Sequence, residues 1–201
     1  FFAGVLCGLL LLHPVYAGNT LPQLMQQIRS EEVVRIPYEE VRHLDLIDQP
    51  WRGSGFMYSM PPDTMILEQV QPEQILMGIR GDSLYYFDSG RGLRHQTILD
   101  EGNPLNLNLA VFKALINANL DLLSRLYEVD FSIQTIGWLI TLKDINAPNS
   151  GFRIDISGEL NKPLDAIKIH QIDGDFTEFK LKQKQTGAKI SALLNGLYNE
   201  L

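Results

Sequence analysis

The sequence predicts a mainly β fold of the α+β class, in which one curved antiparallel sheet packs against helices on its concave side. Two observations carry this prediction. In residues 38–99 and 129–183, short segments rich in apolar and β-branched side chains alternate with turn residues, as is typical of strands. Before, between and after these regions, apolar residues recur at helical spacing. A sheet with an apolar face must bury it, and a layer of helices is a simple cover.

Residues 1–17 have the composition of a secretory signal peptide. The stretch from Phe1 to Leu12 is almost wholly apolar, and small residues lead to a cleavage site after Ala17. The alternative is a short membrane anchor, but this run is shorter than the roughly 20 residues that span a bilayer. We therefore expect export to the periplasm and a single domain over 18–201. Because the only cysteine, Cys7, lies in this leader, disulfides and cysteine metal sites are not expected.

Residues 21–32 are expected to form a short amphipathic helix. Thr20 can cap it, Pro22 suits its first turn, and Gln23 can reach back to the cap. Its apolar face consists of Leu21, Leu24, Met25 and Ile28, at spacings of i, i+3, i+4 and i+7. The spacing predicts that one face of this helix is buried.

The first strand region is expected to contain six strands. The loop at 81–82 has two residues, which predicts a tight hairpin between the strands on either side. Its register places four side chains on one face, apolar apart from one phenol: Met77, Ile79, Leu84 and Tyr86. The strands are expected at 38–48, 54–60, 64–71, 74–80, 83–88 and 92–99.

Asn103-Pro104 is expected to end this region, and 105–126 to form one or two helices, with a separate short helix from Asn119 as an option. The apolar stripe of the first consists of Leu109, Phe112, Leu115 and Ile116. Five further strands are expected at 129–134, 138–144, 151–157, 164–172 and 176–183. From Lys189 onward, leucines at helical spacing predict either a docked helix or a frayed tail.

No catalytic arrangement emerges from the sequence. His43, His95 and His170 lie in three separate predicted strands, with no carboxylate or second histidine at ligand spacing. Ser54 stands between glycines but enters a strand, whereas a nucleophile elbow needs a strand-to-helix turn. We therefore expect no enzyme activity, no metal and no cofactor. The net charge of −7 argues against a nucleic-acid partner.

Methionine is concentrated in one part of the chain. Four of the five methionines are Met57, Met60, Met65 and Met77. Thioether side chains are unbranched and adaptable, so they suit a wall that accepts acyl chains of variable shape. Ordinary core filling is the alternative, and composition alone favours it.

The block from Gly55 to Phe87, GFMYSMPPDTMILEQVQPEQILMGIRGDSLYYF, carries a resemblance to a known family. Its spaced Gly55, Pro62, Pro72 and Gly81, followed by an aromatic-rich strand, resemble the pattern of periplasmic outer-membrane lipoprotein carriers (LolA-type). The order of the helices and later strands extends the likeness over nearly all of 18–201. The resemblance implies an incomplete antiparallel β-barrel of about 10–11 strands, with a helical lid over an apolar cavity.

The resemblance also implies a function and its residues. A protein of this type shelters lipid or lipoprotein acyl chains during transport toward the outer membrane, as a monomer, between an inner-membrane donor and an outer-membrane acceptor protein. With the hairpin register, it predicts the lipid-binding residues Met57, Met65, Leu67, Gln69, Met77, Ile79, Leu84 and Tyr86. It predicts a lid that contains Leu24, Ile28, Phe112, Leu115 and Ile116.

Two departures from the pattern indicate a divergent branch of that family. Where such carriers have an arginine just before the first proline, this chain has Pro61. The tail after Thr186 also has helical spacing where extended structure is usual. Two other functions stay open at this point: a lipid-sensing or scaffolding module of the same fold, and a hydrolase that would need a polar triad in the cavity.

Overall fold

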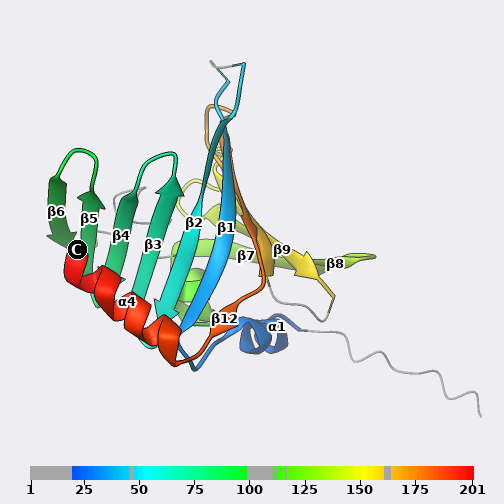
Figure 1. Cartoon of the computed structure of the whole chain (residues 1–201). Helices are drawn as coiled ribbons and strands as arrows, with labels where there is room; N and C mark the ends of the chain where they lie inside the picture. Colours follow the sequence, from blue (N-terminus) through cyan, green and yellow to red (C-terminus); the bar gives the residue numbers. More distant parts are fainter. Residues whose placement is uncertain (1–19, 46–47, 99–110, 112, 116, 161–163) are drawn as a thin grey trace, which may run out of the picture.

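The computed structural model describes the chain except for residues 1–19, 46–47, 99–110, 112, 116 and 161–163. A 12-stranded antiparallel sheet dominates it (Figure 1). The first half of the sheet is a meander of six strands: β1 (Val34–His43), β2 (Trp51–Met60), β3 (Thr64–Gln71), β4 (Ile75–Arg80), β5 (Ser83–Asp88) and β6 (Leu93–Ile98).

The second half of the sheet joins the first through β1. Its strands are β7 (Tyr127–Ile133), β8 (Gly137–Asp144), β9 (Arg153–Glu159), β10 (Leu164–His170), β11 (Phe176–Leu181) and β12 (Gln185–Thr186). The order across the sheet is β6-β5-β4-β3-β2-β1-β11-β10-β9-β8-β7, with β12 paired to β1. Because β6 and β7 stand at opposite edges, the sheet curves without closing, as the incomplete barrel of the prediction does.

Three helices are complete in the described part of the chain: α1 (Leu21–Ile28), α3 (Leu120–Leu126) and α4 (Ala188–Glu200). The N-H of Thr20 donates to Gln23 Oε1 at 2.9 Å, which is half of the predicted capping box. Asn119 caps α3, since its Oδ1 accepts from the N-H of Leu122 at 3.0 Å. Helical residues at 111 and 113–115 precede α3. Within the described residues, no helix has the length and apolar character needed to cross a bilayer.

The predicted mainly β fold is confirmed, with differences at the boundaries. The first helix ends at Ile28 and not near Glu32, and the first strand begins at Val34 and not at 38. The earlier start is tolerated because Pro37, which has no N-H, lies where β11 has ended and β12 has not begun. Its carbonyl still accepts from the N-H of Lys182 at 2.9 Å. The structure has one strand more than the eleven that were expected. This strand, β12, was not predicted because its two residues are too few to show alternation.

The two faces of the sheet bury different clusters. On the inner face, residues of β1–β3 and β7–β11 pack with α1, α3 and the residues Val111, Ala114 and Leu115 into the main core. On the outer face, Tyr58 and Ile66 pack with Ile190 and Leu194 of α4. Strand β3 shows the division, because Met65 belongs to the inner cluster and Ile66 to the outer one.

The C-terminal segment is a docked helix and not a frayed tail. Helix α4 lies along the outer face of the first half of the sheet (Figure 1). The guanidinium of Arg80 stands 3.4 Å from the centre of the Tyr198 ring, and Tyr85 meets the same ring edge-on at 5.7 Å. Gly78 leaves room for the Leu201 side chain, which a methyl group there would overlap. A helix thus covers the outer face of β2–β5.

Leu194 is 0 % exposed and sits at the centre of this contact, while its neighbour Leu193 is 48 % exposed. We expect Leu194→Ala to lower the free energy of unfolding by about 3 kcal/mol, since it leaves a cavity between α4 and the sheet. Leu193→Ala, the matched control, should change it by less than about 0.5 kcal/mol. Urea unfolding followed by circular dichroism measures both. Equal effects would mean that α4 is not held by this face.

Candidate functional site

The eight predicted lipid-binding residues all lie on the inner face of β2–β5. The strand register aligns Met57, Leu67, Met77 and Tyr86 in one row across four strands. A second row contains Met65, Ile79 and Leu84, with Ser59 at its end. Gln69 lies in the next row, opposite Gly55 and Ile75. The register predicted for the hairpin at 81–82 is confirmed, and the sheet extends it to β2 and β3.

Five of these residues form what we call the apolar wall: Met57, Met65, Leu67, Met77 and Ile79. Met57, Met65 and Ile79 are at most 2 % exposed, and Met77 is half-buried. Toward the β6 edge, Leu84 and Tyr86 are also half-buried. Gln69 is buried, and its Nε2 donates to the carbonyl of Glu73 at 3.0 Å, so its polar end is satisfied within the chain. The wall is therefore most deeply covered over β2 and β3.

Residues of the predicted lid belong to the same core cluster as the wall. Leu24 and Leu115 are fully buried and belong to the same cluster as Met57, Met65 and Leu67, and Ile28 packs against that cluster. Phe112 and Ile116 lie outside the described residues. Met25, which was not among the predicted lid residues, is as deeply buried as Leu24. The helical spacing placed it on the apolar face of α1.

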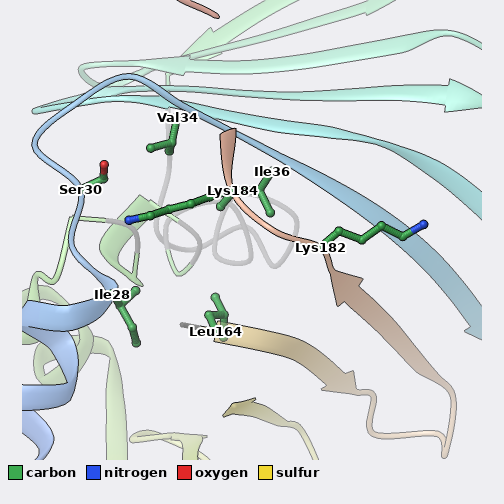
Figure 2. Close-up of a pocket in the computed structure, with 7 residues that line it drawn as sticks. All are labelled: Ile28, Ser30, Val34, Ile36, Leu164, Lys182 and Lys184. Carbon is green, nitrogen blue, oxygen red and sulfur yellow. The ribbon is translucent and has the colours of Figure 1, made fainter. Parts of the chain in front are cut away.

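A small pocket opens between α1 and the sheet (Figure 2). Ile28 of α1 and Leu164 of β10 point toward each other across it, and Lys184 reaches over it from the stretch before β12. The other lining residues are Ser30, Val34, Ile36 and Lys182. Its volume is about 40 Å³, while a cavity that admits benzene has about 150 Å³. An acyl chain does not fit into this pocket unless α1 moves away from the sheet.

The apolar surface of the inner face ends one row beyond the wall, and polar residues follow it on β1 and β2 toward the turn that joins these two strands. Tyr38, Glu40 and Arg42 follow one another on this face of β1, opposite Gly55, Gly53 and Trp51 of β2. Arg42 Nε donates to Glu40 Oε1 at 2.6 Å, and the guanidinium lies 4.3 Å from the centre of the Trp51 ring. We call Tyr38, Glu40, Arg42 and Trp51 the polar end.

Burial dominates the electrostatics of the polar end. Tyr38 and Glu40 are each 2 % exposed. Desolvation raises the pKa of the Glu40 carboxyl, and the Arg42 guanidinium opposes that shift. Desolvation, with the Glu40 charge added to it, raises the pKa of the Tyr38 phenol, which stays protonated at neutral pH. The Tyr38 hydroxyl has no hydrogen-bond partner in the described part of the chain.

Sequence reasoning missed the polar end. Ile36, Tyr38 and Glu40 share the inner face of β1, but the strand was expected to start only at 38. Two other hydrogen-bonding groups of the inner cluster, Tyr127 OH and Trp138 Nε1, are also buried without a partner among the described residues.

The outer face of the second half holds a polar cluster around His170. Its Nε2 lies 3.0 Å from Asp155 Oδ2 on the neighbouring strand. Arg153 Nε donates to the same oxygen at 3.0 Å, and Thr141 Oγ1 donates to Asp155 Oδ1 at 2.9 Å. The β9–β10 register brings these residues together, and spacing along the chain could not reveal it. Among the described residues, no group of three or more His, Cys, Asp or Glu is arranged to hold a metal ion.

No protein-family model matches the chain, and no curated protein matches it. Among solved structures, a DUF1329 family protein from Desulfovibrio piger matches with a TM-score of 0.50 and 11% identity, over 87% of this chain and 94% of that one. A LolA-superfamily protein from Nitrosomonas europaea matches with a TM-score of 0.47 and 7% identity, over 84% and 92%. At these identities the likeness is one of fold alone.

The outer cluster gives a test of pH dependence. Burial, and then the Arg153 charge, lower the pKa of the His170 imidazole against the opposing pull of Asp155. The unfolded chain therefore binds a proton before the folded one does, so His170 reduces stability as the pH falls through its unfolded pKa. We expect His170→Gln to flatten the decline in the free energy of unfolding between about pH 8 and pH 5. Urea unfolding at a series of pH values measures it, and parallel curves for the two proteins would contradict it.

Proposed function

We propose that this protein is a non-enzymatic periplasmic carrier that shelters the acyl chains of lipids or lipoproteins on its inner face. The observation that supports this most is the apolar wall, which crosses three neighbouring strands without a charged side chain and is covered by short helices. The inner face of the sheet supplies an extended apolar surface, and the helices supply a cover that can be removed.

The energetics favour exchange of the cover for cargo. Helix α1 has eight residues, and an isolated helix of that length is marginal in water. Its position therefore depends on the burial of side chains such as Leu24 and Met25, which contributes about 1.5–3 kcal/mol each. One long acyl chain represents roughly 10 kcal/mol of transfer free energy at ~0.8 kcal/mol per buried CH₂. A chain that lies along the wall can therefore offset the displacement of α1.

The location and partners belong to the same proposal. Residues 1–17 act as a signal peptide that is cleaved after Ala17, and 18–201 fold as one domain. The carrier works as a monomer, takes its cargo from an inner-membrane protein and delivers it to an outer-membrane protein. The acidic net charge of −7 suits a carrier that must not linger on anionic lipid surfaces. A lipid-sensing or scaffolding module would instead hold lipid without passing it on.

A charge in the wall should prevent binding. Met77 is a half-buried wall residue, so Met77→Glu places a carboxylate on the inner face with less disruption than a change at the deeply buried Met65. We expect it to weaken the uptake of a fluorescent hydrophobe by about tenfold or more, since a bound acyl chain would leave the charge without water. Ile136→Glu adds the same charge at a position 82 % exposed and should bind as the parent does. Equal binding by both variants, with native circular dichroism spectra, would reject the wall.

The movement of α1 has a separate test. Ile28 and Leu164 line the same pocket from α1 and β10, so cysteines there can be joined by a short, reducible thiol cross-linker in the cleaved protein, 18–201, which has no other cysteine. We expect cross-linking to slow hydrophobe uptake by at least about tenfold, and reduction of the linker to restore it. Lipid transfer between donor and acceptor vesicles should follow the same pattern. Stable lipid binding without transfer would favour the sensing module over the carrier.

A further inference from the structure

We infer that the polar end (Tyr38, Glu40, Arg42 and Trp51) binds the head group of an amphiphile whose acyl chain lies on the apolar wall, and that this head group is uncharged and carries a hydrogen-bond donor and an acceptor together, as an acyl amide or a monoacylglycerol does. The inference rests on the proposed carrier function and adds the chemical class of the cargo to it.

The polar end continues the wall along the strands. Met57 pairs with Ile36, Gly55 with Tyr38, and Gly53 with Glu40, so each step along β1 leads two residues further from the wall. Two residues of a strand span about 7 Å, which places the Glu40 row about 14 Å from the Met57 row. An extended amphiphile can therefore lie along one line, with its chain on the wall and its head group beside Tyr38 and Glu40.

The Tyr38 hydroxyl is the group that points to a ligand. It is almost fully buried on the inner face and has no partner among the described residues. A buried hydroxyl without a partner is costly, and each such group in a folded protein needs an explanation. A ligand carbonyl or hydroxyl that accepts from Tyr38 provides one.

The buried carboxylate of Glu40 favours an uncharged head group over an anionic one. Its carboxylate is 2 % exposed and is paired with Arg42, so the two side chains together carry no net charge. An anionic head group would have to lie against this buried carboxylate, and like charges placed together in an interface cost several kcal/mol. A neutral head group can donate to Glu40 and accept from Tyr38 without adding a charge.

Within the polar end, the Trp51 ring fills the space beside Glu40 and Arg42 in the free protein. The ring lies over Gly53, where a methyl group would overlap it, and the Arg42 guanidinium stacks on the ring. The β3 backbone at Glu68 and Gln69 fills the place of a side chain at Gly55, so the room opposite Glu40 lies at Gly53, under the Trp51 ring. A head group bound there displaces or contacts the ring, so Trp51 reports on binding. The chain has two tryptophans, and in Trp138→Phe the remaining one is Trp51.

The test compares two ligands with the same acyl chain, oleoylglycerol and oleate, at mildly alkaline pH. Affinities come from displacement of a fluorescent hydrophobe, and Trp51 emission in the Trp138→Phe background reports contact with the polar end. We expect the parent protein to bind oleoylglycerol about tenfold more tightly than oleate, with a change in Trp51 emission for oleoylglycerol.

Three variants locate the preference. Tyr38→Phe removes only the hydroxyl and should weaken oleoylglycerol binding by about fivefold to tenfold while leaving the hydrophobe unaffected. Tyr127→Phe is the matched control, since it removes another buried hydroxyl without a described partner, from β7 at the edge of the sheet, and should change neither affinity. Glu40→Gln leaves the Arg42 charge unopposed and should bring the two affinities to within about twofold.

The outcomes separate this inference from the function on which it rests. If the hydrophobe binds and the two ligands bind equally, or if Tyr38→Phe behaves like Tyr127→Phe, the inference fails and the carrier stands. If neither the hydrophobe nor any lipid binds to the folded protein, the carrier function fails. If Tyr38→Phe lowers the stability of the free protein as the loss of a hydrogen bond would, the hydroxyl has a partner such as bound water, and the inference fails on its premise.

Discussion

Burial of the central strands on both faces is the constraint on which the rest of the structure depends. In β3, the first four residues, 64–67, are all buried. Met65 and Leu67 belong to the inner cluster, and Ile66 packs with α4 in the outer one. A strand in this position cannot slip by one residue, since the slip would exchange its inner and outer side chains. The register of β2–β5 follows from this constraint, and with it the alignment of Met57, Leu67 and Met77 into one row.

The fold was predictable to the extent that each element carries its own local signal. The two-residue loop at 81–82 correctly predicted the register of its hairpin, and the alternation in 129–133 correctly predicted a strand. The spacing of Leu21, Leu24 and Ile28 predicted the buried face of α1. The predicted ends of strands and helices were wrong where contacts between distant parts of the chain outweighed a local sequence signal. The first strand was expected to begin at 38 but begins at Val34, because a gap between two partner strands accommodates Pro37, which has no N-H.

The candidate site was predictable only in part, for a related reason. Apolar positions on a strand reveal themselves by periodicity, so the wall residues were found from the sequence, with the resemblance supplying those of β2 and β3. The polar end and the cluster around His170 depend on which strands are neighbours. Glu40 meets Gly53 through β1–β2 pairing, and His170 meets Asp155 through β9–β10 pairing. Spacing within one strand contains no information about such contacts, and a buried carboxylate looks like any surface carboxylate in the sequence.

The position of α4 has a consequence for how the two surfaces of the protein communicate. A β-strand is one residue thick, so Met77 on the inner face and Gly78 on the outer face are consecutive links of a single backbone. Leu201 rests on Gly78, and Tyr198 rests on Arg80 and Tyr85 of the adjoining outer positions. Any increase in the curvature of β4 and β5 that makes room inside must therefore alter the seat of α4 outside. Occupation of the inner face by cargo would therefore change the packing of α4 on the outer face.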